Sequence, residues 1–397
     1  MPVAMADRVH SPVPTGELER RWALVRGLMV DEGVDALVVH SHVDGIGGAT
    51  RWFADLPAGG GYPTSVVFPR EAPMTAILHG PIGGDRTIPR GDPFLRGIGR
   101  VRQTASFASA AYCDTYDADL ILDSLLELAP KRVGIFGAAQ TPWTMLDRIR
   151  RGLEGVDLVD VRGLIDPIKA VKSPVEQRRL REAAAMQDAA LAHAFEIAAP
   201  GMRESDLSAE LMRFCTEHGG EGGVCMIGSA PLGEPAAFRL RQFQDRVIEP
   251  GDQLTVVIEA SGPGGYYTHT GRIAIFGPAP AAMVEEHDFA LAAQAFCVER
   301  LVDGARPAEI TAAYDEYMVS HDRPAESRLL GHGQGYDLVE RPLIRGDETM
   351  PVAVGMQIGV HPMYERNGVF AYVCDDYFIT DDGAQRIHDF TQELIEL

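Results

Sequence analysis

The chain has 397 residues, a length that fits two domains or one large domain. It carries 36 Lys and Arg against 57 Asp and Glu, so its formal net charge at pH 7 is −21. This acidic balance argues against a nucleic-acid binder and against an anionic membrane surface as partner, because both need clustered basic side chains. The charge favours a soluble protein and leaves metal ions and small cationic or zwitterionic ligands as candidate partners.

Cysteine usage and apolar patterning predict a cytoplasmic protein. The five cysteines lie far apart and form no C-x-x-C pair, which is typical of free thiols in a reducing compartment. The first 20 residues contain no continuous apolar stretch of the kind found in secretory signals. No run reaches the roughly 18 apolar residues that a membrane helix needs.

Helix and strand patterns alternate along the first 165 residues. Apolar residues at helical spacing predict a helix from Thr15 to Glu32, which Gly33 ends. The next predicted elements are strands over 34–39, 64–69, 74–79 and 132–136, and a helix over 117–128. This alternation is typical of a layered α/β domain.

The pattern changes near residues 165–172, where we place a domain boundary. Ser173 and Pro174 fit the N-cap and the first position of a long helix that continues to Ala198. Beyond it we predict helices over 204–218, 281–301 and 308–320, and strands over 254–259, 272–276, 357–361 and 372–379. The expected organisation is two domains, 1–167 and 168–397.

Side chains that bind metals concentrate in the second half of the chain. Glu259 and His269 flank a glycine-rich bend, His332 lies in GHGQG, His361 in GVHP, and Asp375 in VCDDYF. Taken one at a time, each has an ordinary alternative: a histidine in a tight turn, a histidine in the core or an aspartate in a hairpin. Their meaning depends on whether the fold brings them together.

These segments resemble the creatinase, prolidase and methionine aminopeptidase family (M24-like). The matching pieces occur in family order: IKAVKSPVEQRRLREAA, PGMRESDLSAEL, EPGDQLTVVIEA, GGYYTHTGR, GHGQGYDLVERP, VAVGMQIGVHP and VCDDYFITDDG. The resemblance runs from about Asp166 to the C-terminus. It implies an α/β (α+β) chain with an N-terminal creatinase-like domain and a C-terminal pita-bread catalytic domain, and it implies a homodimer.

The resemblance also implies a metal site with altered ligands. The family's peptidases hold two metal ions with two aspartates, one histidine and two glutamates, and the matching positions here are Glu259, His269, His332, His361 and Asp375. The position of His269 bridges both ions in the family, whereas an imidazole nitrogen offers its lone pair to one metal. We therefore predict one divalent ion per chain on His269, His332, His361 and Asp375, with Fe(II) favoured and Zn or Mn as alternatives. Glu259, without a second metal to bind, then becomes a candidate general base or a partner that holds an imidazole N–H.

Other positions argue against a conventional dinuclear peptidase. Val339 stands where the family's peptidases have another histidine, seven residues after His332. We predict Tyr267 and Glu340 as further catalytic residues, each with a structural role as the alternative. The candidate substrate-binding residues are Arg239, Arg241, Tyr266 and Arg272, because guanidinium groups bind carboxylates in bidentate geometry.

Three functions remain open at this point. The altered ligands favour a mononuclear, Fe(II)-dependent oxidase, oxygenase or lyase that acts on a small polar substrate derived from an amino acid. The second function is metal-dependent hydrolysis of a C–N bond in an amide, an amidine or an Xaa-Pro-type dipeptide. The third is a catalytically inactive binding protein on the same scaffold.

Overall fold

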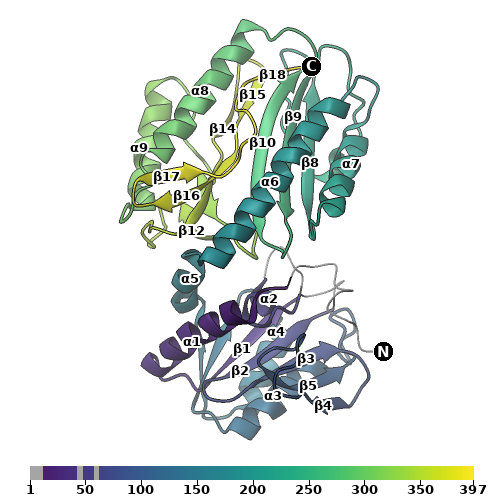
Figure 1. Cartoon of the computed structure of the whole chain (residues 1–397), viewed down its shortest axis with the longest axis vertical. Helices are drawn as coiled ribbons and strands as arrows, with labels where there is room; N and C mark the ends of the chain where they lie inside the picture. The colour runs from purple at the N-terminus through teal and green to yellow at the C-terminus, as the bar shows by residue number, and fades with distance from the viewer. Residues whose placement is uncertain (1–11, 43–47, 58–61) are drawn as a thin grey trace. The chain divides into compact units, whose positions relative to one another are not determined.

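The computed structural model describes residues 12–42, 48–57 and 62–397. The chain forms two compact units, Met1–Ile168 and Lys169–Leu397, which Figure 1 colours from purple to blue and from teal to yellow. No helix within the described residues is long and apolar enough to cross a membrane.

Unit 1 is built on one sheet, whose described strands follow the order β4-β5-β3-β2-β1-β6-β7. At its centre, β1 (Ala36–Ser41) pairs antiparallel with β2 (Thr64–Pro69) and parallel with β6 (Arg132–Phe136). The other elements are β3 (Met74–His79), β4 (Gly84–Thr87), β5 (Ile98–Thr104), β7 (Asp157–Asp160), α1 (Thr15–Asp31), α2 (Ala49–Ala54), α3 (Tyr116–Leu128), α4 (Trp143–Gly152) and α5 (Arg162–Ala170). The strands predicted over 64–69, 74–79 and 132–136 are confirmed with the expected bounds.

Unit 2 contains two larger sheets and a hairpin. One sheet has the order β18-β10-β9-β8, the other has the order β12-β11-β13-β16-β17, and β14 pairs with β15. The strands are β8 (Gly222–Ala230), β9 (Gln253–Ser261), β10 (Tyr267–Ile275), β11 (Gly331–Gly333), β12 (Glu340–Ile344), β13 (Gln357–Val360), β14 (Met363–Arg366), β15 (Val369–Tyr372), β16 (Asp375–Thr380), β17 (Gly383–Arg386) and β18 (Ile395–Glu396).

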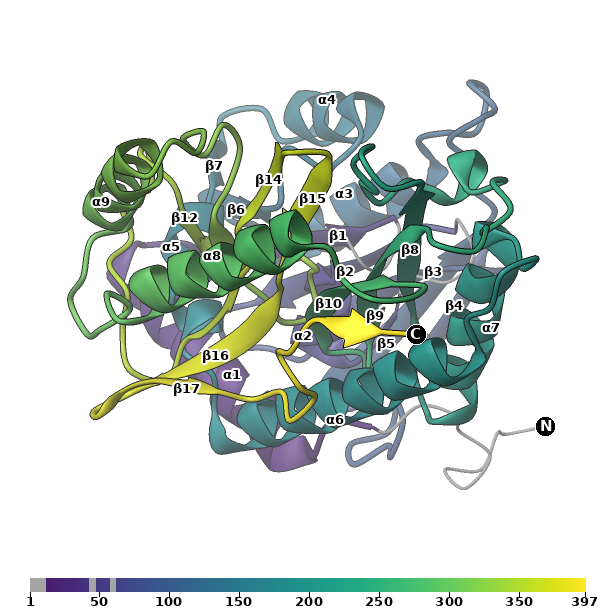
Figure 2. The ribbon, with the colours of Figure 1, turned by 90° about the horizontal axis from the view of Figure 1, so that it is seen from above.

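Two pairs of helices cover these sheets. Helices α6 (Pro174–Ile197) and α7 (Glu204–Glu217) pack on the first sheet, and α8 (Ala281–Val298) and α9 (Pro307–Ser320) pack on the second. Figure 2 shows α8 beside β15, with α6 running along another side of the unit. Each sheet thus buries one face beneath a helix pair, as layered architectures require.

The start of α6 is confirmed at Pro174. The Ser173 side chain accepts a hydrogen bond from the Glu176 backbone N–H (3.2 Å), and the Glu176 carboxylate accepts one from the Ser173 N–H (2.8 Å). This reciprocal pair satisfies two backbone donors at the helix N-terminus. The sequence signal and the observed boundary therefore have the same physical origin.

The two sheets of unit 2 are linked where Gly271 in β10 meets Cys374. Each residue's backbone N–H donates to the other's carbonyl, at 3.3 and 3.2 Å. A Cβ atom on Gly271 would lie 2.5 Å from a ring atom of Tyr372, so the approach requires glycine. Because Cys374 serves this bridge, the strand predicted over 372–379 is divided: β15 ends at Tyr372 and β16 begins at Asp375.

Candidate metal centre

Three buried histidines meet at the junction of the two sheets. His269 lies in β10, His332 lies in β11, and His361 directly follows β13. The ring centroids of His269 and His332 are 4.9 Å apart, and His361 lies 5.3 Å from each. One ligand atom of each ring lies within 4.8 Å of the other two. Three imidazoles in this arrangement are a suitable ligand set for one transition-metal ion.

A glycine on β13 makes room for this cluster. Gly359 is the register partner of His332 on one side and of Asp376 on the other. A Cβ atom at Gly359 would lie 1.8 Å from Cε1 of His269 and 2.5 Å from Oδ1 of Asp376. The His269 ring therefore occupies the space that any other residue at position 359 would fill.

Hydrogen bonds fix which ring nitrogens carry protons. Nδ1 of His332 lies 3.0 Å from the Gly333 carbonyl, and Nδ1 of His269 lies 2.9 Å from Oδ1 of Asp376. A carbonyl or an ionised carboxylate only accepts, so each Nδ1 donates and each Nε2 is left for a ligand. This arrangement, in which a carboxylate or carbonyl orients a histidine, is common around metals.

The Nε2 atom of His269 is buried and has no hydrogen-bond partner among the described residues. A buried polar atom without a partner is costly in a folded protein and calls for an explanation. A metal ion bound to this nitrogen would satisfy it. The residues present therefore fit the metal that the chemistry of the cluster suggests.

Burial also sets the charge of the cluster. Burial, together with the neighbouring His269, lowers the pKa of His332 to about 3 and that of His361 well below its ordinary value. Burial would lower the pKa of His269 too, but Cys374 and Asp376 outweigh it and raise that pKa. Metals bind only unprotonated imidazoles. His332 and His361 are therefore already in the form that binds metal at neutral pH.

Glu259 lies beside this cluster on β9. Its register partner across the strand pair is His269, and its carboxylate forms no hydrogen bond with any described residue. Burial raises its pKa, against the opposing charges of His269 and Arg328. A carboxylate with a raised pKa is suited to accept and return a proton near neutral pH.

Asp375 does not join the histidine group. Its Oδ1 accepts hydrogen bonds from Nη2 of Arg272 (2.7 Å) and Nη2 of Arg386 (2.8 Å), and its Oδ2 accepts one from Gln392 (2.8 Å). The neighbouring Asp376 is the carboxylate that contacts His269. Successive side chains of a strand point to opposite faces. Asp376 faces the histidines, so Asp375 points to the other face of the strand. This position does not match the metal contact predicted for Asp375 from the sequence.

Arg272 is buried and its donors are occupied within the protein. Besides Asp375, it donates to the carbonyls of Thr391 (2.7 Å), Gly271 (2.8 Å) and Cys374 (2.9 Å). The substrate-binding role expected for this side chain does not match this environment. Its bonds instead hold the Gly271–Cys374 bridge beneath the cluster.

Glu340 is likewise an ion-paired side chain in the interior. Its carboxylate lies 2.7 Å from Nζ of Lys172 and 3.2 Å from Nζ of Lys169. Burial alone would raise its pKa, but the two lysines outweigh it and lower that pKa to about 2. Both oxygens of Glu340 are engaged by lysines, an environment that does not match the catalytic role predicted from the sequence.

The remaining predicted residues lie in two other settings. Tyr266 is buried with its ring 4.2 Å from that of Tyr336, and the Tyr267 backbone N–H donates to the Gly335 carbonyl (2.7 Å). Both tyrosines thus brace the segment that follows His332. Arg239 and Arg241, in contrast, are exposed, and their side chains form no hydrogen bond or ion pair with the described residues.

Arg328 is a charged residue near the cluster that the sequence motifs do not single out. Burial and the charge of His269 are the larger causes of the lowered pKa values of His332 and His361, and the positive charge of Arg328 adds a smaller contribution. The same charge opposes the rise in the pKa of Glu259. The side chain is exposed, and its guanidinium forms no ion pair with the described part of the chain. The sequence feature that points to Arg328 is its position four residues before His332, in ESRLLGHGQG.

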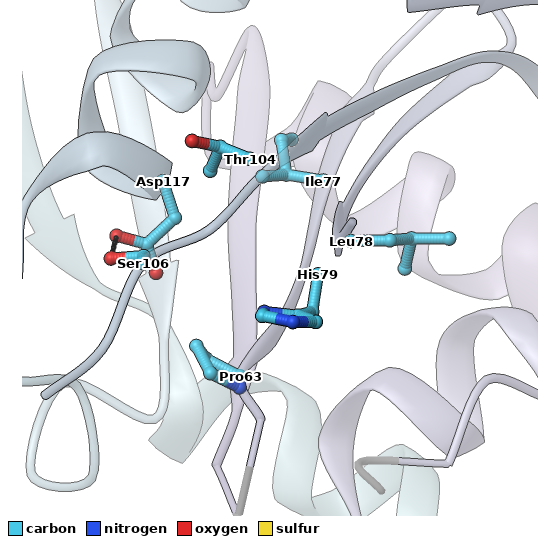
Figure 3. Close-up of a pocket in the computed structure, with 7 residues that line it drawn as sticks. All are labelled: Pro63, Ile77, Leu78, His79, Thr104, Ser106 and Asp117. Carbon is cyan, nitrogen blue, oxygen red and sulfur yellow. Dashed lines mark hydrogen bonds between the residues drawn. The ribbon is translucent and has the colours of Figure 1, made fainter. Parts of the chain in front are cut away.

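Unit 1 offers no comparable constellation at the pocket drawn in Figure 3. There Ser106 donates a hydrogen bond to Asp117 (3.0 Å) beside His79 and Pro63. The pocket volume is about 10 Å³, which is room for one water molecule. Among the described residues, the histidine cluster of unit 2 is the group whose side chains are close enough to hold a metal ion.

Two sheets, each covered by a helix pair and with the three histidines at their junction, form the pita-bread fold, as the structural comparisons show. The model of metallopeptidase family M24 matches residues 178–389, and the chain belongs to this family. Its members bind divalent metals. The fold and family expected from the sequence motifs are thereby confirmed.

Relatives are found along nearly the whole chain. A probable dipeptidase PepE of Mycobacterium tuberculosis is 26% identical over 391 residues, covering 95% of this chain and 96% of its own. The X-Pro aminopeptidase from Thermotoga maritima superposes with a TM-score of 0.77 at 16% identity, covering 95% of this chain and 99% of its own. Dipeptidase PepE from Mycobacterium ulcerans gives a TM-score of 0.76 at 20% identity, covering 97% and 99%.

Proposed function

We propose that this protein is a metal-dependent hydrolase that cleaves an amide bond in a small substrate, with one divalent ion held by His269, His332 and His361. The observation that carries the proposal is the cluster of three buried imidazoles, with a buried Nε2 on His269 that has no described partner. The names of relatives such as the probable dipeptidase PepE support hydrolysis. They give no support to the oxidative or lyase chemistry that the altered ligands first suggested.

Three imidazoles leave positions open on the ion for water and substrate. When bound, a divalent ion supplies Lewis acidity and lowers the pKa of water. Zn, Mn and Fe(II) all accept imidazole ligands, so the preference for Fe(II) stays a prediction. The homodimer and the cytoplasmic location stay predictions as well.

Glu259 is the residue that moves the proton in this proposal. Its carboxylate takes a proton from the attacking water and returns it to the leaving nitrogen, so that the amine departs neutral. The raised pKa supports this role, because a carboxylic acid that is too strong would hold the proton poorly. The free carboxylate beside His269 supports it independently.

Arg328 provides the contact with substrate. Its exposed guanidinium carries a positive charge close enough to act on Glu259, His332 and His361. A guanidinium binds a carboxylate through two parallel hydrogen bonds. The substrate class that fits is a compact amide with a free carboxylate, such as a dipeptide or an N-acyl amino acid.

The test is an amine-release assay on protein loaded separately with Zn, Mn or Fe(II). The substrates are dipeptides, including Xaa-Pro dipeptides, and N-acyl amino acids. We expect hydrolysis by the wild type, and a loss of about 10²–10⁴-fold in kcat for Glu259→Gln with metal content unchanged. The matched control Glu234→Gln, at an exposed position, should keep full activity. Consumption of oxygen without amine release would overturn the proposal and support the oxidative alternative, and a lack of turnover with every metal would support an inactive binding protein.

A further inference from the structure

A continuous line of hydrogen bonds leads away from the histidine cluster through unit 2. Oδ1 of Asp376 lies 2.9 Å from Nδ1 of His269, and its Oδ2 accepts from the His269 backbone N–H at 2.9 Å. The same Oδ2 of Asp376 also lies 3.3 Å from Nε2 of His388. Nδ1 of His388 lies 2.8 Å from Oδ1 of Asp188 on α6. Four residues from four separate segments thus join the cluster to a helix.

His388 lies between two carboxylates and donates to both. Ionised carboxylates have no proton to give, so both ring nitrogens of His388 carry hydrogen and the ring is a buried cation. Burial would lower the pKa of His388, but Asp188 and Asp376 outweigh it and raise that pKa to about 9. The side chain is 0% exposed, so this charge is shielded from solvent.

Such a buried arrangement of charges is not explained by stability alone. Taking ions out of water costs several kcal/mol for each ion, and apolar side chains of similar size often fill the same space at no loss. What the charges provide is orientation: His388 holds Oδ2 of Asp376 while Oδ1 faces the His269 ring. The Asp376 carboxylate binds both the ring and the backbone of His269, so its position sets the direction of the unpartnered Nε2.

We propose that Asp188 and His388 are positioning residues for the metal centre, which act through Asp376 to hold His269 in the orientation and tautomer that bind the ion. This inference rests on the proposed metal centre. Neither residue touches the cluster directly, and their effect is transmitted by hydrogen bonds. Outer partners of ligating histidines commonly change metal affinity by about 10–100-fold.

The experiment measures binding of Co²⁺ to the full-length metal-free protein by competition with a chelator, and records the visible spectrum of the bound ion. We expect His388→Gln to weaken Co²⁺ binding by about 10–100-fold and to change the spectrum, because the ligand geometry shifts. Asp188→Asn, at a more exposed position, should produce a smaller change in the same direction. The matched control is His193→Gln, which removes a histidine of α6 that pairs with Glu210 at 3.3 Å, outside this line of bonds.

A double-mutant cycle separates positioning from general stability. If His388 acts through Asp376, then His388→Gln should cause no further loss of Co²⁺ affinity in an Asp376→Asn background. Losses of Co²⁺ affinity that add up in the double variant would overturn the inference. So would wild-type Co²⁺ affinity and a wild-type spectrum in both His388→Gln and Asp188→Asn. Both conclusions hold whatever the melting temperatures of the variants. If His388→Gln does not fold, Asp188→Asn alone decides by the same readouts. Absence of Co²⁺ binding by the wild type would overturn the metal centre itself, and with it this inference.

Discussion

Two buried clusters each include residues of the segment GHGQGYDLVER, and they differ in how their polar groups are satisfied. In the lysine–carboxylate cluster, formed by Lys169, Lys172, Asp337 and Glu340, ammonium and carboxylate groups lie 2.7–3.2 Å apart. In the histidine cluster, the buried Nε2 of His269 has no described partner. Both clusters consist of residue types typical of active sites. From this difference we propose that the first cluster stabilises the fold and that the second binds a metal ion.

The largest expected effect comes from removing the central charge of the lysine–carboxylate cluster. Glu340→Gln leaves Lys172 buried without its carboxylate, and breaking a buried pair in this way costs about 3–5 kcal/mol. Urea unfolding at pH 7 measures the loss. The variant should retain its metal, and a Glu340→Gln protein of wild-type stability that lost only catalysis would reverse the assignment of the two clusters.

Acid should weaken the same cluster in a defined pH range. The pKa of Glu340 is lowered to about 2 in the folded protein from its ordinary value of 4.5. A lowered pKa contributes stability above the unfolded value, and this contribution disappears as the pH falls from 4.5 towards 2. The shift corresponds to about 3 kcal/mol. Between those pH values the free energy of unfolding of wild type should fall more steeply than that of Glu340→Gln, and parallel curves would contradict the account.

Gly359→Ala tests the histidine cluster without changing any ligand. The new methyl group overlaps the His269 ring and Asp376, so His269 must move, at a cost of about 1–3 kcal/mol from overpacking. We expect loss of bound metal as well. Gly346→Ala is the control, because a Cβ atom there meets nothing within 4 Å. If Gly359→Ala bound as much metal as the wild type, the ion would not be held by His269.

The smallest expected effect concerns substrate binding. Arg328→Ala should raise KM for a substrate with a free carboxylate by about 10–100-fold, since a hydrogen bond to a charged group contributes about 1.5–3 kcal/mol. Steady-state kinetics on an acid substrate and on its carboxamide give the comparison. The KM for the carboxamide should change little in Arg328→Ala. An equal rise in KM for both substrates would show that Arg328 does not recognise the carboxylate.

The sequence predicts most of the elements but only part of the site. Strands 64–69 and 132–136 are short apolar runs between turn signals, and such local patterns determine strand bounds well. His269, His332 and His361 were found because their residue types and motif order are visible without coordinates. The long strand β10, from Tyr267 to Ile275, extends five residues before the predicted start, because its first half consists of polar residues that only the fold buries.

What the sequence did not predict depends on side-chain direction and on distant partners. Asp375 and Asp376 are adjacent, and which of them faces the cluster is decided by strand register. Glu340 and Lys172 are separated by 168 positions, so their pairing exists only in the folded chain. Arg328 lies in the segment before β11, and its nearness to the histidines follows from the path of that segment.

The number of metal ions per chain tests the central claim most directly. Protein purified in metal-free buffer, loaded with excess Zn, Mn or Fe(II) and desalted should contain one ion per chain by elemental analysis. The double variant His332→Ala with His361→Ala should contain none, and His193→Ala, outside the cluster, should match the wild type. Two ions per chain in the wild type, or one ion retained in the double variant, would contradict a single metal held by His269, His332 and His361.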